Sequence, residues 1–517
     1  MRAGRILMMA ATAMAVLALA PAGASAGSRQ FSIIEDDAVF LGLTPRSGKV
    51  ALRESRQLGA DAVRVVLSWR RASPGSAQRT IPAGFDPANH RSRGYDWKRY
   101  DDLVNGARRQ GLKVILDPSP SIPYWGSSEP RRCPHFVGGQ RKLGLGCFWK
   151  PDPRLFGKFV RAAATRYRGK VAFYSIYNEP NLENYIYPQT QRTSAGRVDL
   201  GGKLLRQLWI AGFKAIKQAD PGARRRVLFG ETAAISSPRD TLYSALCLDR
   251  RGRPYRGKIK QAQGCSKPSM LPIGGLAVHP YNSSALGSVF TRTSTKASMT
   301  MAYLSRATKL LKVAEKHKRI PRGRGVYVTE TGFQTRPPSV RGLGLGSQAK
   351  AINEADRLFF DDPRIRSTAQ FELFDVPEQP GDVFNTGLRT VRGVAKPSLA
   401  AYRMPLVVTR RGGGKVEVWG QVRPARGRAR PLISVSRSAK GPFRRLRAAR
   451  TNPAGYYRFE LRRRGAARLR YRASWRDLRS RVARPGRPIA YREPLSRASM
   501  RCSPGRRPGC APPARGR

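Results

Sequence analysis

Acidic residues are scarce in this chain, and histidine is scarcer still. The 517 residues include 33 aspartates and glutamates and four histidines, against 98 lysines and arginines. His90, His135 and His317 stand at no spacing that is typical of a metal site. The six cysteines include no C-x-x-C pair, which argues against the common zinc and dithiol redox motifs. We therefore expect neither a metal ion nor a cofactor.

Long apolar runs are also lacking after residue 26. A membrane-spanning helix needs about 20 apolar residues, and the one candidate, residues 6–20, is shorter. It follows Arg2 and Arg5 and precedes Ala24-Ser25-Ala26, a pattern typical of a secretory signal peptide that is cleaved after residue 26. A retained N-terminal anchor is the alternative. We expect a secreted, monomeric protein, with association to the cell wall as a further option.

The charge of the chain is strongly one-sided, with a formal net value of +65. Such an excess can attract polyanions such as nucleic acid or an acidic cell-wall polymer. A general preference for arginine would give the same number, because the basic residues are spread along the whole length and no DNA- or RNA-binding motif accompanies them. We expect no specific nucleic-acid partner.

The cysteines fall into three pairs that are close in sequence, within loops rich in Gly, Pro and Arg. Six cysteines allow 15 pairings, but short loops favour the local ones, and free thiols are the alternative. The expected disulfides are Cys133–Cys147, Cys247–Cys265 and Cys502–Cys510.

Two glutamates end apolar runs that have the composition of buried strands. Glu179 ends the run 171–179 and Glu330 ends the run 326–330, and a turn follows each. A carboxylate at a buried strand end is costly unless it faces a cavity. Two such groups are what acid/base and nucleophilic chemistry at a glycosidic bond requires.

Eight strand-like runs alternate with helical patterns between residues 30 and 403, which predicts a (β/α)8 barrel. The expected strands are 39–42, 62–69, 113–119, 171–179, 227–232, 276–281, 326–330 and 369–375. Helical patterns run from residue 203 to 219 and from an N-cap at Ser347 to residue 358. In such a barrel the catalytic groups lie at the C-terminal strand ends, where both glutamates fall.

The pattern changes after residue 403. Residues 404–485 contain short alternating strands with turns between them, which predicts a small antiparallel β-sandwich. Residues 404–517 hold 32 basic and 4 acidic residues. This module could bind an acidic glycan or wall polymer, or it could be an inert spacer. Residues 486–517, rich in Arg, Pro and Gly, are expected to form a disordered tail.

Three motifs together resemble the clan A retaining glycoside hydrolases, most closely families 5 and 39. They are Asn178-Glu179-Pro180, Thr329-Glu330-Thr331-Gly332 and Ala277-Val278-His279-Pro280-Tyr281. The resemblance covers the barrel and implies that Glu179 is the acid/base and Glu330 the nucleophile. It further implies that Asn178 binds the sugar 2-hydroxyl, that Arg64 keeps Glu330 ionised, and that Tyr281, paired with His279, orients Glu330.

Other candidates have two interpretations each. Glu231 also ends a strand and is expected either to contact substrate or to be structural. Trp69, Trp125 and Phe374 could stack on sugars or pack in the core. Phe374 lies on the expected eighth strand, where the clan usually carries a tryptophan that this chain lacks.

We expect a retaining β-glycosidase that acts on a polysaccharide or an oligosaccharide. The alternatives are a non-catalytic carbohydrate- or wall-binding protein on a barrel scaffold and an arginine-driven polyanion-binding surface protein.

Overall fold

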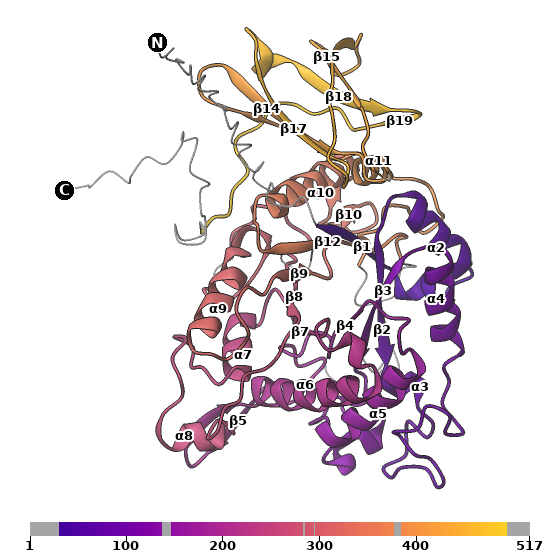
Figure 1. Cartoon of the computed structure of the whole chain (residues 1–517), viewed down its shortest axis with the longest axis vertical. Coiled ribbons are helices and arrows are strands. Elements are labelled where there is room, and N and C mark those ends of the chain that lie inside the picture. Colours follow the sequence, from indigo (N-terminus) through magenta and orange to yellow (C-terminus); the bar gives the residue numbers. More distant parts are fainter. Residues whose placement is uncertain are drawn as a thin grey trace, which may run out of the picture.

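The computed structural model describes residues 30–136, 146–282, 285–293, 295–376, 384–425 and 427–493. Eight parallel strands form one sheet in the order β4-β3-β2-β1-β12-β9-β8-β7. A parallel bridge between Tyr174 of β4 and Val227, directly before β7, joins the two edges of this sheet. The sheet is therefore a closed barrel, as the sequence predicted, with helices around its outside (Figure 1).

Each barrel strand is followed by a helix. The strands are β1 (Phe31–Glu35), β2 (Ala62–Ser68), β3 (Lys113–Ser119), β4 (Phe173–Tyr174), β7 (Leu228–Ala233), β8 (Gly275–His279), β9 (Val326–Val328) and β12 (Ile365–Phe371). The helices that follow them in turn are α2 (Gly48–Gln57), α4 (Lys98–Arg109), α5 (Pro153–Arg166), α6 (Leu200–Ala219), α7 (Pro238–Ala245), α9 (Ser305–Lys316), α10 (Leu345–Phe360) and α11 (Pro397–Arg403). Shorter elements in the loops are α1 (Asp37–Phe40), α3 (Trp69–Ala72), α8 (Gly257–Ala262), β5 (Thr190–Thr193), β6 (Gly196–Asp199), β10 (Thr335–Arg336) and β11 (Leu343–Gly344).

Local sequence explains where these helices start and which face they bury. In α5 the Asp152 carboxylate accepts hydrogen bonds from the backbone N–H groups of Arg154 and Leu155, at 2.7 and 3.2 Å. Such a cap satisfies N–H groups that have no partner within the helix. In α4 the buried residues Tyr100, Leu103, Val104 and Ala107 recur three and four positions apart, so one stripe packs on the barrel.

The first strand was predicted at the wrong place. Residues 37–40 form α1, and the Asp36 side chain caps it by accepting from the Val39 N–H. The first barrel strand is instead β1, whose Ile33 and Ile34 are fully buried. A short apolar run cannot be assigned to a strand or a buried helix by periodicity alone, and the capping aspartate decides in favour of the helix.

Three further elements have other bounds than predicted. The expected strand 171–179 is much shorter in the structure, where β4 covers only Phe173–Tyr174 and Glu179 lies in the loop that follows it. The eighth strand, β12, starts at Ile365 rather than at 369, because its polar residues Ser367 and Thr368 are buried in the barrel. Ser347 was expected to cap the helix between the seventh and eighth strands. That helix, α10, begins earlier, at Leu345 after Gly344. The sequence locates these elements correctly and their ends only approximately.

Residues beyond α11 form two antiparallel sheets. One contains β13 (Leu406–Arg410), β14 (Lys415–Gln421) and β17 (Tyr456–Arg462) in the order β13-β14-β17. The other contains β15 (Leu432–Ser436), β16 (Arg444–Ala448), β18 (Arg470–Trp475) and β19 (Leu478–Arg479) in the order β16-β15-β18-β19. Val416 and Val418 of the first sheet share an apolar core with Ile433 and Tyr471 of the second. The module is thus a small β-sandwich.

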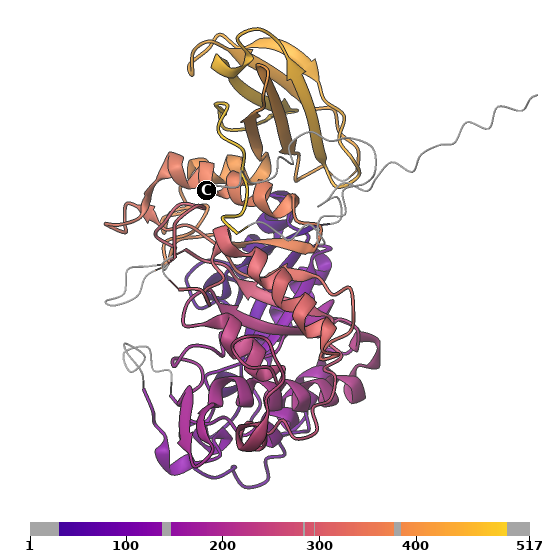
Figure 2. The same ribbon diagram turned by 90° about the vertical axis from the view of Figure 1, so that its left-hand side faces the viewer.

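The three-stranded sheet packs on the barrel through α10 (Figure 2). Trp419 of β14 lies against Phe360 of α10, with ring centroids 5.4 Å apart. Next to them Arg357 of α10 pairs with Glu417 of β14 at 2.7 Å, both buried. Arg481, just past β19 of the four-stranded sheet, also reaches the barrel, where its Nε donates to Asn353 Oδ1 of α10 at 3.0 Å.

A buried ion pair contributes to this contact between barrel and sandwich. Arg423 Nη2 donates to Asp356 Oδ2 at 2.9 Å, and Arg423 Nη1 donates to the Tyr402 carbonyl at 2.8 Å. We expect Arg423→Met to lower the free energy of unfolding by about 3–5 kcal/mol, because the Asp356 carboxylate would stay buried without its partner. Thermal denaturation measures this. Arg430→Met, at an exposed position of the same module, is the control and should leave the melting temperature unchanged.

The start of the expected tail is ordered. Arg306 of α9 pairs with Glu493, with Nε 3.1 Å from Oε2, and Ile489 and Tyr491 pack against the barrel core. Residues 486–493 therefore return from the sandwich to the barrel, contrary to the prediction. The remainder of the tail, Cys502, Cys510 and the expected signal peptide lie outside the described residues.

Two of the three expected disulfides are present, Cys133–Cys147 and Cys247–Cys265. Of the helices in the described part of the chain, none combines the length and the apolar character needed to span a bilayer.

Candidate active site

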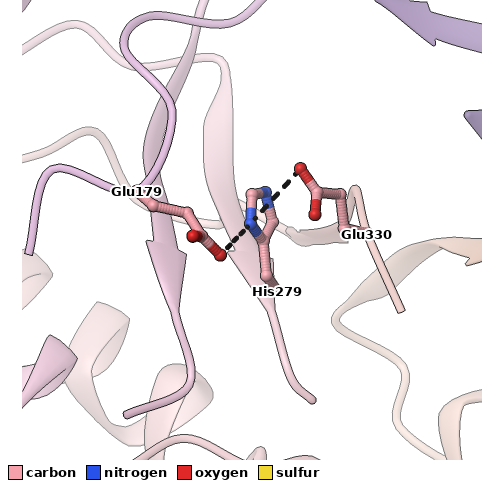
Figure 3. A group of neighbouring side chains, drawn as sticks. All are labelled: Glu179, His279 and Glu330. Atoms are coloured by element: carbon pink, nitrogen blue, oxygen red, sulfur yellow. Dashed lines mark hydrogen bonds and ion pairs between the residues drawn. The ribbon is translucent and has the colours of Figure 1, made fainter. Parts of the chain in front are cut away.

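Glu179 and Glu330 meet at one end of the barrel. Glu179 follows β4 and Glu330 follows β9, so both lie past the C-terminal ends of their strands. One carboxylate oxygen of each, together with one ring nitrogen of His279, lies within 4.8 Å of the others. Figure 3 shows the two carboxylates on either side of the His279 ring. Their side chains are 14% and 10% exposed, so both reach the surface of the mouth.

His279, the last residue of β8, bridges several carboxylates. Its Nδ1 lies 3.0 Å from Glu179 Oε1 and 3.5 Å from Glu330 Oε1, and its Nε2 lies 2.6 Å from Glu231 Oε2. Burial lowers the pKa of His279, but the Glu330 charge and the hydrogen bonds to Glu179 and Glu231 outweigh it and raise the pKa well above the usual value. Both ring nitrogens face carboxyl oxygens, an arrangement that favours the charged ring, which can donate from each nitrogen.

Arg64 of β2 is the second cation of the site and is fully buried. Its Nη1 donates to both Glu35 oxygens at 2.6 and 2.7 Å and to Glu330 Oε1 at 2.7 Å. Its Nη2 donates to Asp117 Oδ2 at 2.7 Å and to Glu231 Oε2 at 3.0 Å. One guanidinium thus serves four carboxyl groups from four different strands or strand ends, a geometry that its fork of donors permits.

Burial affects the four carboxyl groups around Arg64 unequally. Burial raises the pKa of Asp117 to about 8, against the opposing Arg64 charge, and raises that of Glu35 well above the usual value. Burial also raises the pKa of Glu231, but Arg64 and the hydrogen bond and charge of His279 lower it by more, to about 2. The donors around Glu231 thus favour its charged form, whereas burial works against the charge of Glu35 and Asp117.

Glu231 is held by further donors and does not reach the surface. The Ser175 hydroxyl donates to its Oε1, and the Thr329 hydroxyl donates to its Oε2 at 3.0 Å. Its side chain is 0% exposed. Of the two interpretations of this residue, contact with substrate is wrong and the structural one holds.

The surroundings of Glu330 favour a carboxylate. Arg64 Nη1 bonds its Oε1, and the Tyr281 hydroxyl donates to its Oε2 at 3.1 Å. Both oxygens are thus held by donors, which fixes the direction of the group. The Asn178 Oδ1 accepts from Arg64 Nη2 at 2.8 Å. Because arginine only donates, this bond sets the amide orientation and leaves the Asn178 NH2 group as a donor.

The surroundings of Glu179 differ from those of Glu330, because burial dominates over donors. Burial is the largest influence on its pKa and raises it, and the His279 hydrogen bond only partly opposes this. The backbone of Glu179 is left-handed, with φ of 43°, and its N–H donates to the Glu231 carbonyl at 2.8 Å. A non-glycine residue in this region is strained by about 1–2 kcal/mol, and such strain is typical of functional sites.

Glu179, His279 and Glu330 also have the residue types and proximity of a metal site. A metal ligand must offer a lone pair, and a histidine ligand must be neutral. His279 uses both ring nitrogens as donors to carboxylates, so it offers none. The group is better described as two carboxyls linked by a cation.

The aromatic candidates lie away from this mouth or are covered. Trp69 begins α3, is 0% exposed and stacks on Phe159, with ring centroids 5.7 Å apart. Trp125 is 2% exposed and lies edge-on to Trp69. The guanidinium of Arg46 covers the Phe374 ring at 4.4 Å. The prediction of sugar-stacking platforms is wrong for Trp69 and Trp125, which pack in the core.

Three acidic groups at the barrel mouth were not predicted. Glu35 ends β1, and Asp117 lies inside β3. Glu372 directly follows β12, and burial raises its pKa well above the usual value, with Glu35 and Glu330 adding to the effect. Glu35 could have been found had β1 been recognised, because it occupies the same place on its strand as the predicted residues.

No protein-family model and no curated protein matches this chain. Among solved structures, a glucosidase from Croceicoccus marinus is 11% identical, with a TM-score of 0.48 over 84% of this chain and 94% of that one. A broad-specificity endoglucanase from Clostridium acetobutylicum is 12% identical, with a TM-score of 0.42 over 73% and 98%. Xylanase B from Clostridium stercorarium is 14% identical, with a TM-score of 0.41 over 72% and 96%. Likenesses this distant do not assign an activity, so the assignment depends on the site itself.

Proposed function

We propose that this protein is a retaining glycoside hydrolase that cleaves β-linked bonds in polysaccharides or oligosaccharides. The observation that carries the proposal is the approach of Glu179 and Glu330 oxygens to within 4.8 Å in opposite surroundings. Retaining enzymes hold their two carboxyl groups about 5–5.5 Å apart, whereas inverting enzymes need about 6.5–9.5 Å to admit a water molecule. The short separation supports double displacement.

In the first step a Glu330 carboxylate oxygen attacks the anomeric carbon. The bond from that carbon to the leaving oxygen breaks, its electron pair stays on the leaving oxygen, and that oxygen takes the proton of Glu179. Arg64 and Tyr281 hold Glu330 ionised and aimed. The Asn178 NH2 group, oriented by Arg64, is placed to donate to a sugar hydroxyl.

In the second step water attacks the anomeric carbon of the glycosyl ester. Glu179, now a carboxylate, takes a proton from the water, and the ester bond breaks to restore the Glu330 carboxylate. His279 stabilises the Glu179 carboxylate through the bond from Nδ1.

The acid role of Glu179 predicts a change in the pH profile. Its pKa is raised, and the first step needs its protonated form, so wild-type activity should fall as pH rises through that pKa. Glu179→Gln should lose about 10²–10⁴-fold in kcat/KM on a β-glycoside with a poor leaving group. With an activated aryl leaving group the loss should be smaller, and the alkaline fall should disappear.

Turnover of a panel of aryl β-glycosides at several pH values measures both effects. Glu460→Gln, at an exposed position on β17, is the matched control and should behave as wild type. An unchanged pH profile in Glu179→Gln would contradict the acid role. Glycan binding by the wild type without any turnover would instead support a non-catalytic carbohydrate-binding protein.

We also propose that the protein acts outside the cytoplasm. The two disulfides link loop cysteines, and such bonds persist in oxidising compartments. N-terminal sequencing of protein from the culture medium should start after residue 26.

A further inference from the structure

One face of the four-stranded sheet is directed away from the sandwich core. Ile433 and Val435 of β15 point into the sandwich core, as do Tyr471 and Ala473 of β18. Because successive side chains in a strand alternate between faces, the residues between them point outward. On β15 these are small serines, and on β18 they are arginines.

The strand register places arginines on both sides of one serine. Ser434 of β15 pairs with Arg445 of the edge strand β16 and with Arg472 of β18. Ser436 pairs with Arg470. Neighbouring strands are about 4.8 Å apart, so Arg445 and Arg472 stand about 10 Å from each other across Ser434. The result is a group of arginines on either side of β15, with the side chains of Ser434 and Ser436 buried between them.

These arginines have no acidic partner in the described part of the chain. No ion pair joins Arg445, Arg470 or Arg472 to a carboxylate there. The nearby carboxylate of Glu417 is 2% exposed at the barrel contact, where Arg357 pairs with it. Unlike Arg64 or Arg423, the arginines of this face carry charges that nothing in the described fold neutralises.

We propose that this face binds an acidic polysaccharide through its carboxylate or sulfate groups. Guanidinium groups bind such oxyanions by paired hydrogen bonds. Several unpaired cations on one flat sheet suit a ligand with repeated charges better than one with a single charge. The proposal concerns binding alone and is independent of hydrolysis in the barrel.

The aromatic rings of this face argue against nucleic acid. Proteins that bind single strands stack bases on open aromatic rings. Here the guanidinium of Arg472 covers the Phe443 ring at 4.1 Å. Trp475 packs against the sandwich core, and the guanidinium of Arg476 lies over its ring at 4.4 Å. Rings covered in this way are not open to bases, and for the same reason they offer no platform for a neutral sugar. Electrostatic attraction to the arginines is thus the main means by which this face can recognise a ligand.

The test is retention of the full chain on immobilised polygalacturonate, dextran sulfate and neutral dextran in a salt gradient. Wild type should be retained on a charged polymer and not on dextran. R445S/R470S/R472S should weaken binding by about tenfold or more, as expected for the loss of even one charge-assisted contact. The matched control R91S/R93S/R109S removes the same charge from exposed positions on the barrel and should bind as wild type.

Each other outcome would overturn the proposal. Equal weakening in both triple variants would show diffuse attraction to net charge, and equal retention on dextran would show recognition without charge. Stronger retention on DNA than on either acidic polysaccharide at the same salt would make nucleic acid the partner. R470S alone removes one arginine opposite Ser436, so it tests the same face if the triple variant does not fold. Retention on the polymers is measured without any hydrolysis, so the result does not depend on whether the barrel is a hydrolase.

Discussion

Replacing Glu330 with Gln is expected to lower kcat by at least about 10⁴-fold, the scale of loss when a covalent nucleophile is removed. The amide cannot form the glycosyl ester and carries no charge for Arg64 to stabilise. Turnover of an activated aryl β-glycoside measures the loss. Because Arg64 and Tyr281 remain in place, the melting temperature should change little.

Chemical rescue separates the nucleophile from the acid/base. Glu330→Gly with added azide should form the α-glycosyl azide, because azide enters from the face that Glu330 occupied. Glu179→Gly with azide should form the β-glycosyl azide, because Glu330 still forms the ester and azide replaces the water. The same azide anomer from both variants would mean that the two roles are wrongly assigned.

Replacing Arg64 with Met is expected to cost about 3–5 kcal/mol of unfolding free energy, the scale for breaking a buried ion pair. Four carboxyl groups would lose their shared donor. Activity should fall as well, because Glu330 would lose the cation that keeps it charged. Arg109→Met, exposed on α4, is the control and should change neither quantity.

The stability loss in Arg64→Met should depend on pH with a definite sign. In the wild type the pKa of Glu231 is lowered to about 2, so its charge stabilises the fold at pH values above the usual glutamate pKa. This stabilisation is lost as pH falls toward 2. Without Arg64 much of that stability is absent at neutral pH. The difference between variant and wild type should therefore shrink as pH falls through 4 to 2. A constant difference across this range, measured by denaturant unfolding, would contradict the role of Arg64.

The sequence was sufficient to predict the central pair because strand order fixes where strand ends meet. Glu179 and Glu330 each end a recognisable apolar run, and a barrel brings all such ends to one mouth. His279 and Tyr281 fall at the end of an expected strand in the same way, whereas Arg64 lies inside β2 and its role was implied by the resemblance of the motifs. Their contacts with the two glutamates depend on the shared mouth and not on local sequence.

Other features could not be predicted because tertiary contacts decide them. Asp117 lies within the expected strand 113–119, but the local sequence does not indicate that its carboxyl group accepts a hydrogen bond from Arg64. Trp69 stands where β2 ends, but α3 begins there and turns the ring into the core. The sharing of one guanidinium among four acids has no sequence signature, because the partners lie on separate strands.

The anomeric configuration of the first product tests the account most directly. Proton NMR during hydrolysis of an aryl β-glycoside that the protein cleaves distinguishes the anomers before mutarotation mixes them. Carboxyl oxygens within 4.8 Å predict that the β-anomer appears first. Initial release of the α-anomer would mean single displacement by water and would contradict the assignment of Glu330 as nucleophile.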